Sequence, residues 1–182
     1  MVYGLPSIGY ARSVPHPIPV PGSAKARLIA AGIAHFQADG YERASVVEIA
    51  DDAAVTTGSL YHHFGSKLGL YQVIRQEMER RMTERMEGAV AAVGRGRGGV
   101  RIALEVSFDA AVRFGVTRVV AEPSPWGWPD PVAETIERLI PDNAIAAQCV
   151  VAAWRGALLA VANGSPPDVA RSGLAWVLAT PA

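Results

Sequence analysis

Residues 45–67 read SVVEIADDAAVTTGSLYHHFGSK and predict two short helices, a tight turn between them and the start of a third helix. Ser45 and Glu48 have the spacing of a capping box, in which each side chain satisfies a backbone N–H at the helix start. Thr56 is the expected N-cap of the second helix, which Leu60 anchors. Because so short a helix is unstable alone in water, its neighbours must hold it. The pattern predicts a helix-turn-helix whose second helix faces a DNA major groove.

This stretch resembles the DNA-binding domain of the TetR family of transcriptional repressors, over roughly residues 25–76. The matching residues are Ile49, Ala50, Ala53 and Val55, then Thr56, Gly58, Ser59, Leu60, Tyr61 and Phe64, then Ser66 and Lys67. The resemblance implies an all-α protein, with an N-terminal three-helix helix-turn-helix domain and a C-terminal helical bundle for ligand binding and dimerisation. The chain departs from the family at Ala54, where the turn usually carries glycine. An alanine with positive φ there costs roughly 1 kcal/mol.

The chemistry of the stretch suggests which residues contact DNA. Hydroxyl and imidazole groups on the second helix can bond to base edges, while groups at helix starts favour phosphate. A position without a side chain lets the backbone approach the DNA. The resemblance implies contacts at the same positions. The predicted DNA-binding residues are Ser45, Thr56, Thr57, Gly58, Ser59, Tyr61, His62 and Lys67. Capping alone also explains Ser45 and Thr56.

The chain carries 17 basic and 17 acidic residues and so has no formal net charge. That balance is unusual for a protein that neutralises phosphates, so the DNA interpretation depends on the motif. The abundance of alanine and the scarcity of alternating patterns favour an all-α fold. A single cysteine, Cys149, excludes an internal disulfide, fits a cytoplasmic protein and is expected to be buried. No run of about 18 apolar residues lacks a charge or a breaker, so no transmembrane helix is expected.

Three segments are expected along the chain. Residues 1–22 form a Pro-rich tail, which is interpreted as disordered or as an arm that carries Arg12 into a minor groove. Residues 23–68 form the DNA-binding domain and residues 69–182 the ligand-binding and dimerisation domain. Helices are expected at 23–39, 66–90, 100–120 with a division near 115, 131–139, 143–162 and 167–178.

Methionines recur at four-residue spacing along the helix expected at 66–90. They form either plain core or part of the wall of an adaptable ligand cavity. The two tryptophans of the following proline-rich loop either plug the core or line the mouth of a pocket. The predicted ligand-pocket residues are Met78, Met82, Val106, Phe114, Trp126, Trp128 and Trp154. Their character suggests a small apolar or aromatic effector.

The helix expected at 143–162 is apolar almost all round, so we expect it to be buried on nearly every side. Small residues at four-residue spacing let another helix approach closely. The resemblance implies that the last two helices form a four-helix bundle with those of a second subunit. The predicted dimer-interface residues are Gln148, Ala152, Gly156, Ala160, Gly173, Trp176 and Val177.

The sequence therefore predicts a ligand-responsive transcriptional regulator, a repressor that binds a palindromic double-stranded operator as a homodimer and is released by an effector. The alternative is a constitutive DNA-binding regulator, which a cavity well below about 300 Å³ would favour. No enzyme is expected, because no set of nucleophile, base and orienting residue is visible. No cofactor or metal is expected either, because the adjacent His62 and His63 point about 100° apart on a helix.

Overall fold

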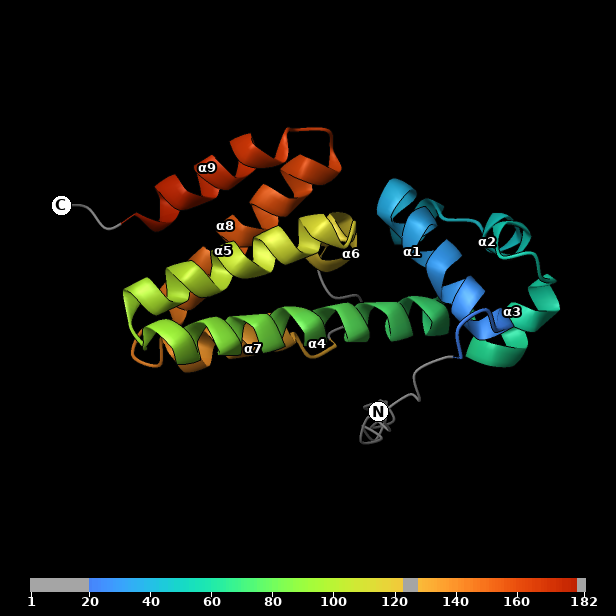
Figure 1. The fold of residues 1–182 in the computed structure, drawn as a ribbon, viewed down its shortest axis with the longest axis horizontal. Helices are drawn as coiled ribbons and strands as arrows, with labels where there is room; N and C mark the ends of the chain where they lie inside the picture. Colours follow the sequence, from blue (N-terminus) through green and yellow to red (C-terminus); the bar gives the residue numbers. More distant parts are fainter. Residues whose placement is uncertain (1–19, 123–127, 180–182) are drawn as a thin grey trace, which may run out of the picture.

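The computed structural model describes residues 20–122 and 128–179 of the 182-residue chain. Within those ranges every regular element is a helix (Figure 1). The helices are α1 (Ala24–Arg43), α2 (Val46–Asp52), α3 (Thr57–Phe64), α4 (Lys67–Val93), α5 (Arg97–Arg113), α6 (Thr117–Ala121), α7 (Pro131–Leu139), α8 (Ala144–Ala162) and α9 (Pro167–Leu178). The predicted tail at residues 1–22 lies almost wholly outside the described residues.

Hydroxyl caps start the first four helices, at Ser23, Ser45, Thr56 and Ser66, and the sequence predicts those of Ser45 and Thr56. The Ser23 Oγ accepts from the Ala26 N–H at 3.2 Å, and the Thr56 Oγ1 accepts from the Ser59 N–H at 3.2 Å. Ser45 and Ser66 accept in the same way from the N–H three residues later. Each cap satisfies one of the backbone donors that a helix start leaves without a partner.

Two glycines with positive φ divide the chain where the sequence indicates a break. Gly40 has φ 76° and interrupts the helical geometry of α1, although a final turn continues to Arg43. Gly115 has φ 63° and separates α5 from α6. Both conformations are easily reached by glycine and costly for other residues.

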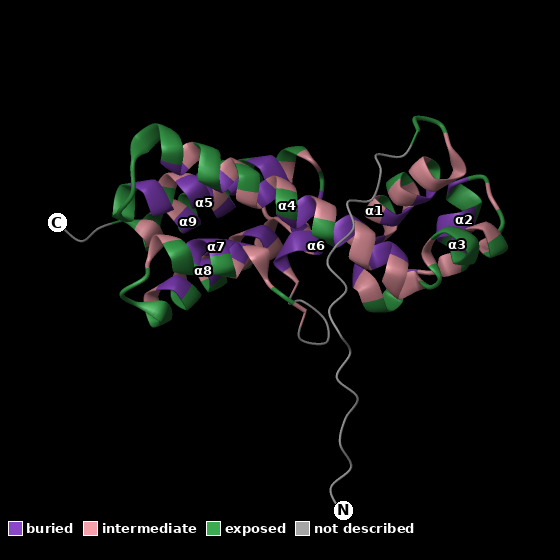
Figure 2. Ribbon diagram, turned by 90° about the horizontal axis from the view of Figure 1, so that it is seen from below, coloured by how far each residue is buried: buried purple, intermediate pink, exposed green. Residues whose placement is uncertain are grey.

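The long helix α4 connects the two parts of the molecule. It starts beside α1 to α3 at one end and runs along α5 through the rest of the protein (Figure 1). Its inward face carries Leu70, Ile74, Met82 and Met86, all almost fully buried. The buried residues of both parts form one continuous core (Figure 2). Since α4 crosses the boundary expected at residue 68, the two domains share a rigid element.

The expectation for α8 is wrong on one point. Its inner face is buried through Val151, Trp154 and Leu158, but the opposite face is exposed in the single chain. Cys149 lies on that exposed face, so its predicted burial is also wrong. By length and composition alone, α8 would qualify as a membrane span, contrary to the expectation from the sequence. Helices that pair with other helices have the same composition.

Candidate DNA-binding interface and ligand groove

The turn between α2 and α3 has the geometry of a helix-turn-helix. Ala54 has φ 50° and is the one non-glycine residue with positive φ among the described residues. The Val55 N–H donates to the Ala50 carbonyl at 3.0 Å and closes the turn. The strained alanine expected from the sequence is therefore present, and the turn keeps its shape.

Two side chains from α1 fasten this turn to the scaffold. The Arg27 Nε donates to the Ala53 carbonyl at 2.8 Å. The His35 Nε2 lies 2.7 Å from the Asp52 Oδ2 at the end of α2. His35 thus has a structural role. Sequence reasoning missed both partners, because they are 26 and 17 residues away along the chain.

The α3 helix is held by its buried Leu60 and presents its other side to solvent. Tyr61 is 52% exposed, and His62 is also exposed on that surface. The remaining predicted contact positions of the motif, partly or fully exposed, are Ser45, Thr56, Thr57, Gly58 and Ser59. These residues lie at the start of α2 and along α3, where solvent reaches them at least in part. Their contacts with DNA remain a prediction.

Lys67 is engaged within the protein. Its Nζ donates to the Glu42 carbonyl at 3.1 Å and to the Ala44 carbonyl at 3.2 Å, and it lies 4.6 Å from the centroid of the Tyr41 ring. An ammonium that already has these partners is poorly placed to bind phosphate. The structure therefore favours a positioning role, in which Lys67 fixes the start of α4 against the end of α1.

The predicted pocket residues do not form one lining. Met78, Met82 and Trp154 are buried in the core, and Trp128 is partly buried beside it. Phe114 lies under the guanidinium groups of Arg81 and Arg85 instead. Val106 is 38% exposed on α5, so its side chain does not face an interior pocket. Trp126 lies outside the described residues.

A buried charged pair, which sequence reasoning missed, lies on α4 inside the C-terminal part. The Arg75 Nε donates to the Glu79 Oε1 at 2.7 Å, and the Arg75 Nη1 donates to the Tyr71 hydroxyl at 3.3 Å. Burial raises the pKa of the Glu79 carboxyl, while the neighbouring Arg75 acts to lower it. The i, i+4 spacing of Arg75 and Glu79 on the inward face of α4 was the signal available in the sequence.

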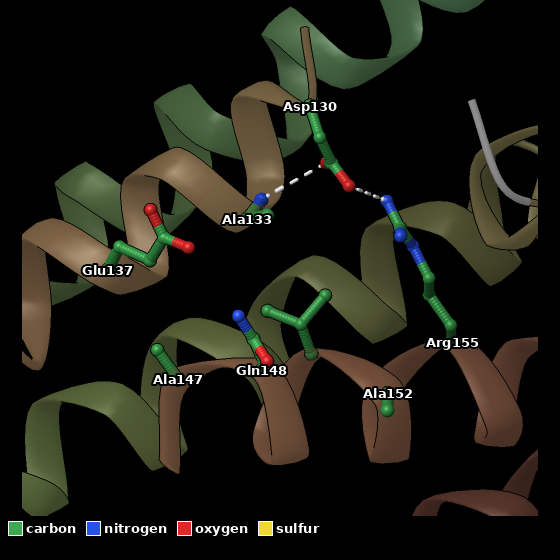
Figure 3. Close-up of a pocket in the computed structure, with 8 residues that line it drawn as sticks. Asp130, Ala133, Glu137, Ala147, Gln148, Ala152 and Arg155 are labelled. Carbon is green, nitrogen blue, oxygen red and sulfur yellow. Dashed lines mark hydrogen bonds and ion pairs between the residues drawn. The ribbon is translucent and has the colours of Figure 1, made fainter. Parts of the chain in front are cut away.

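Two hollows open among the described residues. One, of about 480 Å³, lies between the end of α4 and α7, beside Glu87 and Arg138. The other, of about 380 Å³, lies between α7 and α8. The ion pair of Asp130 with Arg155 closes one end of the second hollow (Figure 3). None of the six predicted pocket residues that the structure describes lines either hollow.

Comparison with known proteins identifies the family. Residues 28–74, which include the whole helix-turn-helix, match the sequence model of bacterial regulatory proteins, tetR family. The chain belongs to the TetR family. This membership agrees with the expectation that it is not an enzyme.

Of two curated relatives of this TetR-family chain, one is named a receptor and the other a transcriptional activator. The chain is 32% identical to the A-factor receptor protein of Streptomyces griseus over 144 residues, which cover 71% of this chain and 51% of that protein. It is 34% identical to the HTH-type transcriptional activator FasR of Mycolicibacterium smegmatis over 85 residues, which cover 47% of this chain and 39% of that protein. The chain therefore spans about half or less of these relatives.

A solved structure agrees with the fold. The TetR-like transcriptional regulator from Rhodococcus sp. RHA1 superposes with a TM-score of 0.66 and 21% identity, covering 88% of this chain and 96% of that one. At this identity the likeness concerns the fold alone. The predicted all-α architecture of the TetR family, with its N-terminal helix-turn-helix and C-terminal helical part, is thereby confirmed.

In the single TetR-family chain, large apolar side chains of α8 and α9 are exposed to solvent. We call this surface the α8–α9 face. Trp176 is 81% exposed there, and the other large exposed apolar side chains are Ile145, Val169 and Val177. Of the seven predicted interface residues, Ala160 is half-buried, and the others are exposed. Exposed large apolar side chains on two adjoining helices favour a surface that pairs with another protein.

Proposed function

We propose that this chain is a cytoplasmic, dimeric DNA-binding regulator of transcription that responds to a small molecule. The observation that carries the proposal is the exposed polar surface of α3 on a family-typical helix-turn-helix, at the end of the molecule from which α4 extends. Hydroxyl, phenol and imidazole groups on such a helix suit base edges and phosphates in a major groove.

The α8–α9 face supports dimerisation. Exposed apolar side chains gain about 25 cal/mol for each Å² that a partner covers, and Trp176 alone offers a large area. A twofold dimer places two α3 helices for adjacent major grooves of a palindromic operator. The proposed dimer would therefore supply the specificity that one uncharged reading helix lacks.

A role as a ligand-responsive repressor is the finer part of the proposal. One relative is named a receptor, which supports an effector, while another is named an activator, so the direction of regulation needs its own test. Both hollows exceed the roughly 300 Å³ below which a regulator without an effector would be favoured. Repression predicts that deleting the gene raises transcription from promoters that carry the operator.

The DNA-binding proposal can be tested without knowing the operator. Selection from random duplexes with the purified protein should return a palindrome with half-sites about one helical turn apart. In gel-shift titrations on that sequence, Tyr61→Ala should weaken binding by about 1–3 kcal/mol. Val106→Ala, an exposed change in the other part of the chain, is the control. Equal affinity of wild type and Tyr61→Ala would contradict the assignment of Tyr61.

A further inference from the structure

The short helix α6 depends on a side chain of the DNA-binding part for its start. Its N-cap, Val116, makes no side-chain hydrogen bond, and so short a helix is unstable by itself. Gln37 of α1 supplies the missing groups. Its Oε1 accepts from the Arg118 N–H at 2.8 Å, and its Nε2 donates to the Thr117 Oγ1 at 2.8 Å. Because Thr117 is buried, water does not readily replace these bonds, and α1 fixes the position of α6.

The guanidinium of Arg118 extends this connection to the end of α8. Its Nε donates to the Gln37 carbonyl of α1, while its Nη2 donates to the Ala162 carbonyl and to the Asn163 Oδ1. The last carbonyls of a helix have no partner within the helix, and the helix dipole favours a cation beside them. The Arg118 side chain is only 15% exposed, and its donors have fixed directions in one plane. Arg118 therefore joins α1 to the end of α8 at a defined distance and angle.

The helices α1 and α6 also approach each other closely at Gly40. A Cβ at Gly40 would lie 2.9 Å from the Glu122 Oε1 and 3.7 Å from the Arg118 Cδ, so a side chain there would have to displace the Glu122 carboxylate. That carboxylate lies 3.8 Å from the Arg118 Nη1. Attraction between the two charges helps to keep the guanidinium against α1. The contact between α1 and α6 thus combines directional hydrogen bonds with close packing.

A second connection between the two parts matters because α4 alone leaves them some freedom. The chain passes from the DNA-binding part, α1 to α3, into the C-terminal part through α4. Long helices bend, so a body held only at one end of such a helix can tilt. The α6 helix contacts both α1 and α8 beside α4 (Figure 1). This second connection resists the tilting that α4 by itself would allow.

We infer that Gln37 and Arg118 are positioning residues that hold the DNA-binding part at one angle to the helices of the α8–α9 face. In the proposed dimer this angle sets the distance between the two α3 helices, and with it the half-site spacing that the protein accepts. The effect on spacing rests on the proposed function. The fixed angle within one chain does not, because it depends only on the bonds from α1 through α6 to α8.

Pulsed electron resonance on the full chain, without DNA, tests the fixed angle. Spin labels on Asp51→Cys of α2 and Glu134→Cys of α7, both exposed positions, report the distance between the two parts in a Cys149→Ser background. Labelled chains are diluted with an excess of unlabelled chains, so that the distance is measured within one chain. The intact link should give one narrow distribution of distances. Arg118→Ala and Gln37→Ala should each broaden it by about twofold, because each removes hydrogen bonds of the link.

Arg138→Ala is the matched control for these changes. Arg138 also donates to two partners, the side chains of Glu87 and Thr135, but both lie within the C-terminal part. Its distribution should stay as narrow as that of the intact link. Circular dichroism confirms that each variant is folded, and the two link variants remove different bonds, so either one is a sufficient test. A broad distribution with the link intact, or an unchanged width in the folded link variants, would overturn the inference.

Binding to operators of different spacing tests the consequence for DNA. One base pair added between the half-sites of the selected palindrome moves them about 3.4 Å apart and rotates one by about 35°. Wild type should bind the altered operator about tenfold more weakly, and each link variant should lower that ratio by about fivefold.

The ratio separates positioning from stability. A change that only lowers the folded fraction weakens binding to both operators equally, so the ratio stays the same. An unchanged ratio in both link variants would contradict the role in spacing. If wild type binds no palindrome, the proposed function is wrong instead, and the distance measurement still tests the link.

Discussion

Arg118 holds Gln37 through both main chain and side chain. The Arg118 N–H donates to the Gln37 Oε1 at 2.8 Å, and the Arg118 Nε donates to the Gln37 carbonyl at 3.1 Å. The Arg118 Nη2 also donates to the Ala162 carbonyl at 3.1 Å and to the Asn163 Oδ1 at 2.9 Å. One residue of α6 therefore connects α1 of the DNA-binding part with the end of α8, which carries the α8–α9 face.

Removing this link is expected to cost stability in an additive way. Gln37→Ala and Arg118→Ala should each lower the free energy of unfolding by about 1–3 kcal/mol, because partly buried donors and acceptors lose their partners. Each side chain bonds to the main chain of the other residue, so either substitution leaves the other bond in place. The losses in the double variant should therefore add within about 0.5 kcal/mol. Urea unfolding of the four proteins gives the coupling energy, and a larger coupling would contradict this description of the link.

Ala54→Gly is expected to stabilise the protein. Alanine at φ 50° pays roughly 1–2 kcal/mol for a left-handed conformation that glycine adopts freely. Glycine also raises the conformational entropy of the unfolded chain, which offsets part of this gain. The free energy of unfolding should therefore rise by up to about 1 kcal/mol. Thermal unfolding provides the measurement. Ala53→Gly is the matched control: Ala53 has φ −76° and is buried, so glycine there should destabilise.

The features that the sequence predicts well are local. A Ser or Thr cap bonds to an N–H three residues away, so Ser45 and Thr56 can be assigned from spacing alone. Gln37 and Arg118 are 81 residues apart, and no local pattern indicates that they meet. The α8 helix was misjudged for another reason. The apolar sequence pattern of a helix is the same whether its own chain or a second copy covers that surface. The exposure of Cys149 therefore could not be inferred from the sequence.

Lys67 is expected to affect stability more than DNA affinity. Lys67→Met removes two hydrogen bonds to the end of α1 and the contact with the Tyr41 ring. The free energy of unfolding should fall by about 1–2 kcal/mol. The slope of log affinity against log salt should stay unchanged, because a lysine without a phosphate contact releases no counterion. A slope that becomes shallower by about one unit would restore Lys67 as a phosphate ligand.

Gly156→Glu is expected to separate the dimer while leaving each chain folded. A side chain at Gly156 would meet no atom within 4 Å in the single chain, and the position is exposed on the α8–α9 face. In the dimer the new carboxylate would be buried without a partner, at a cost of several kcal/mol. Sedimentation equilibrium at micromolar concentration should give twice 19.2 kDa for wild type and 19.2 kDa for the variant.

Gly88→Glu is the matched control for that change. Gly88 is also a helical, exposed glycine with no atom within 4 Å of an added Cβ, but it lies on α4 away from the α8–α9 face. It should sediment as a dimer and bind the operator like wild type. Gly156→Glu should lose operator affinity as well, because two half-sites are no longer joined in one particle. If wild type sediments as a monomer, or if both variants dissociate alike, the assignment of the α8–α9 face as the dimer surface is wrong.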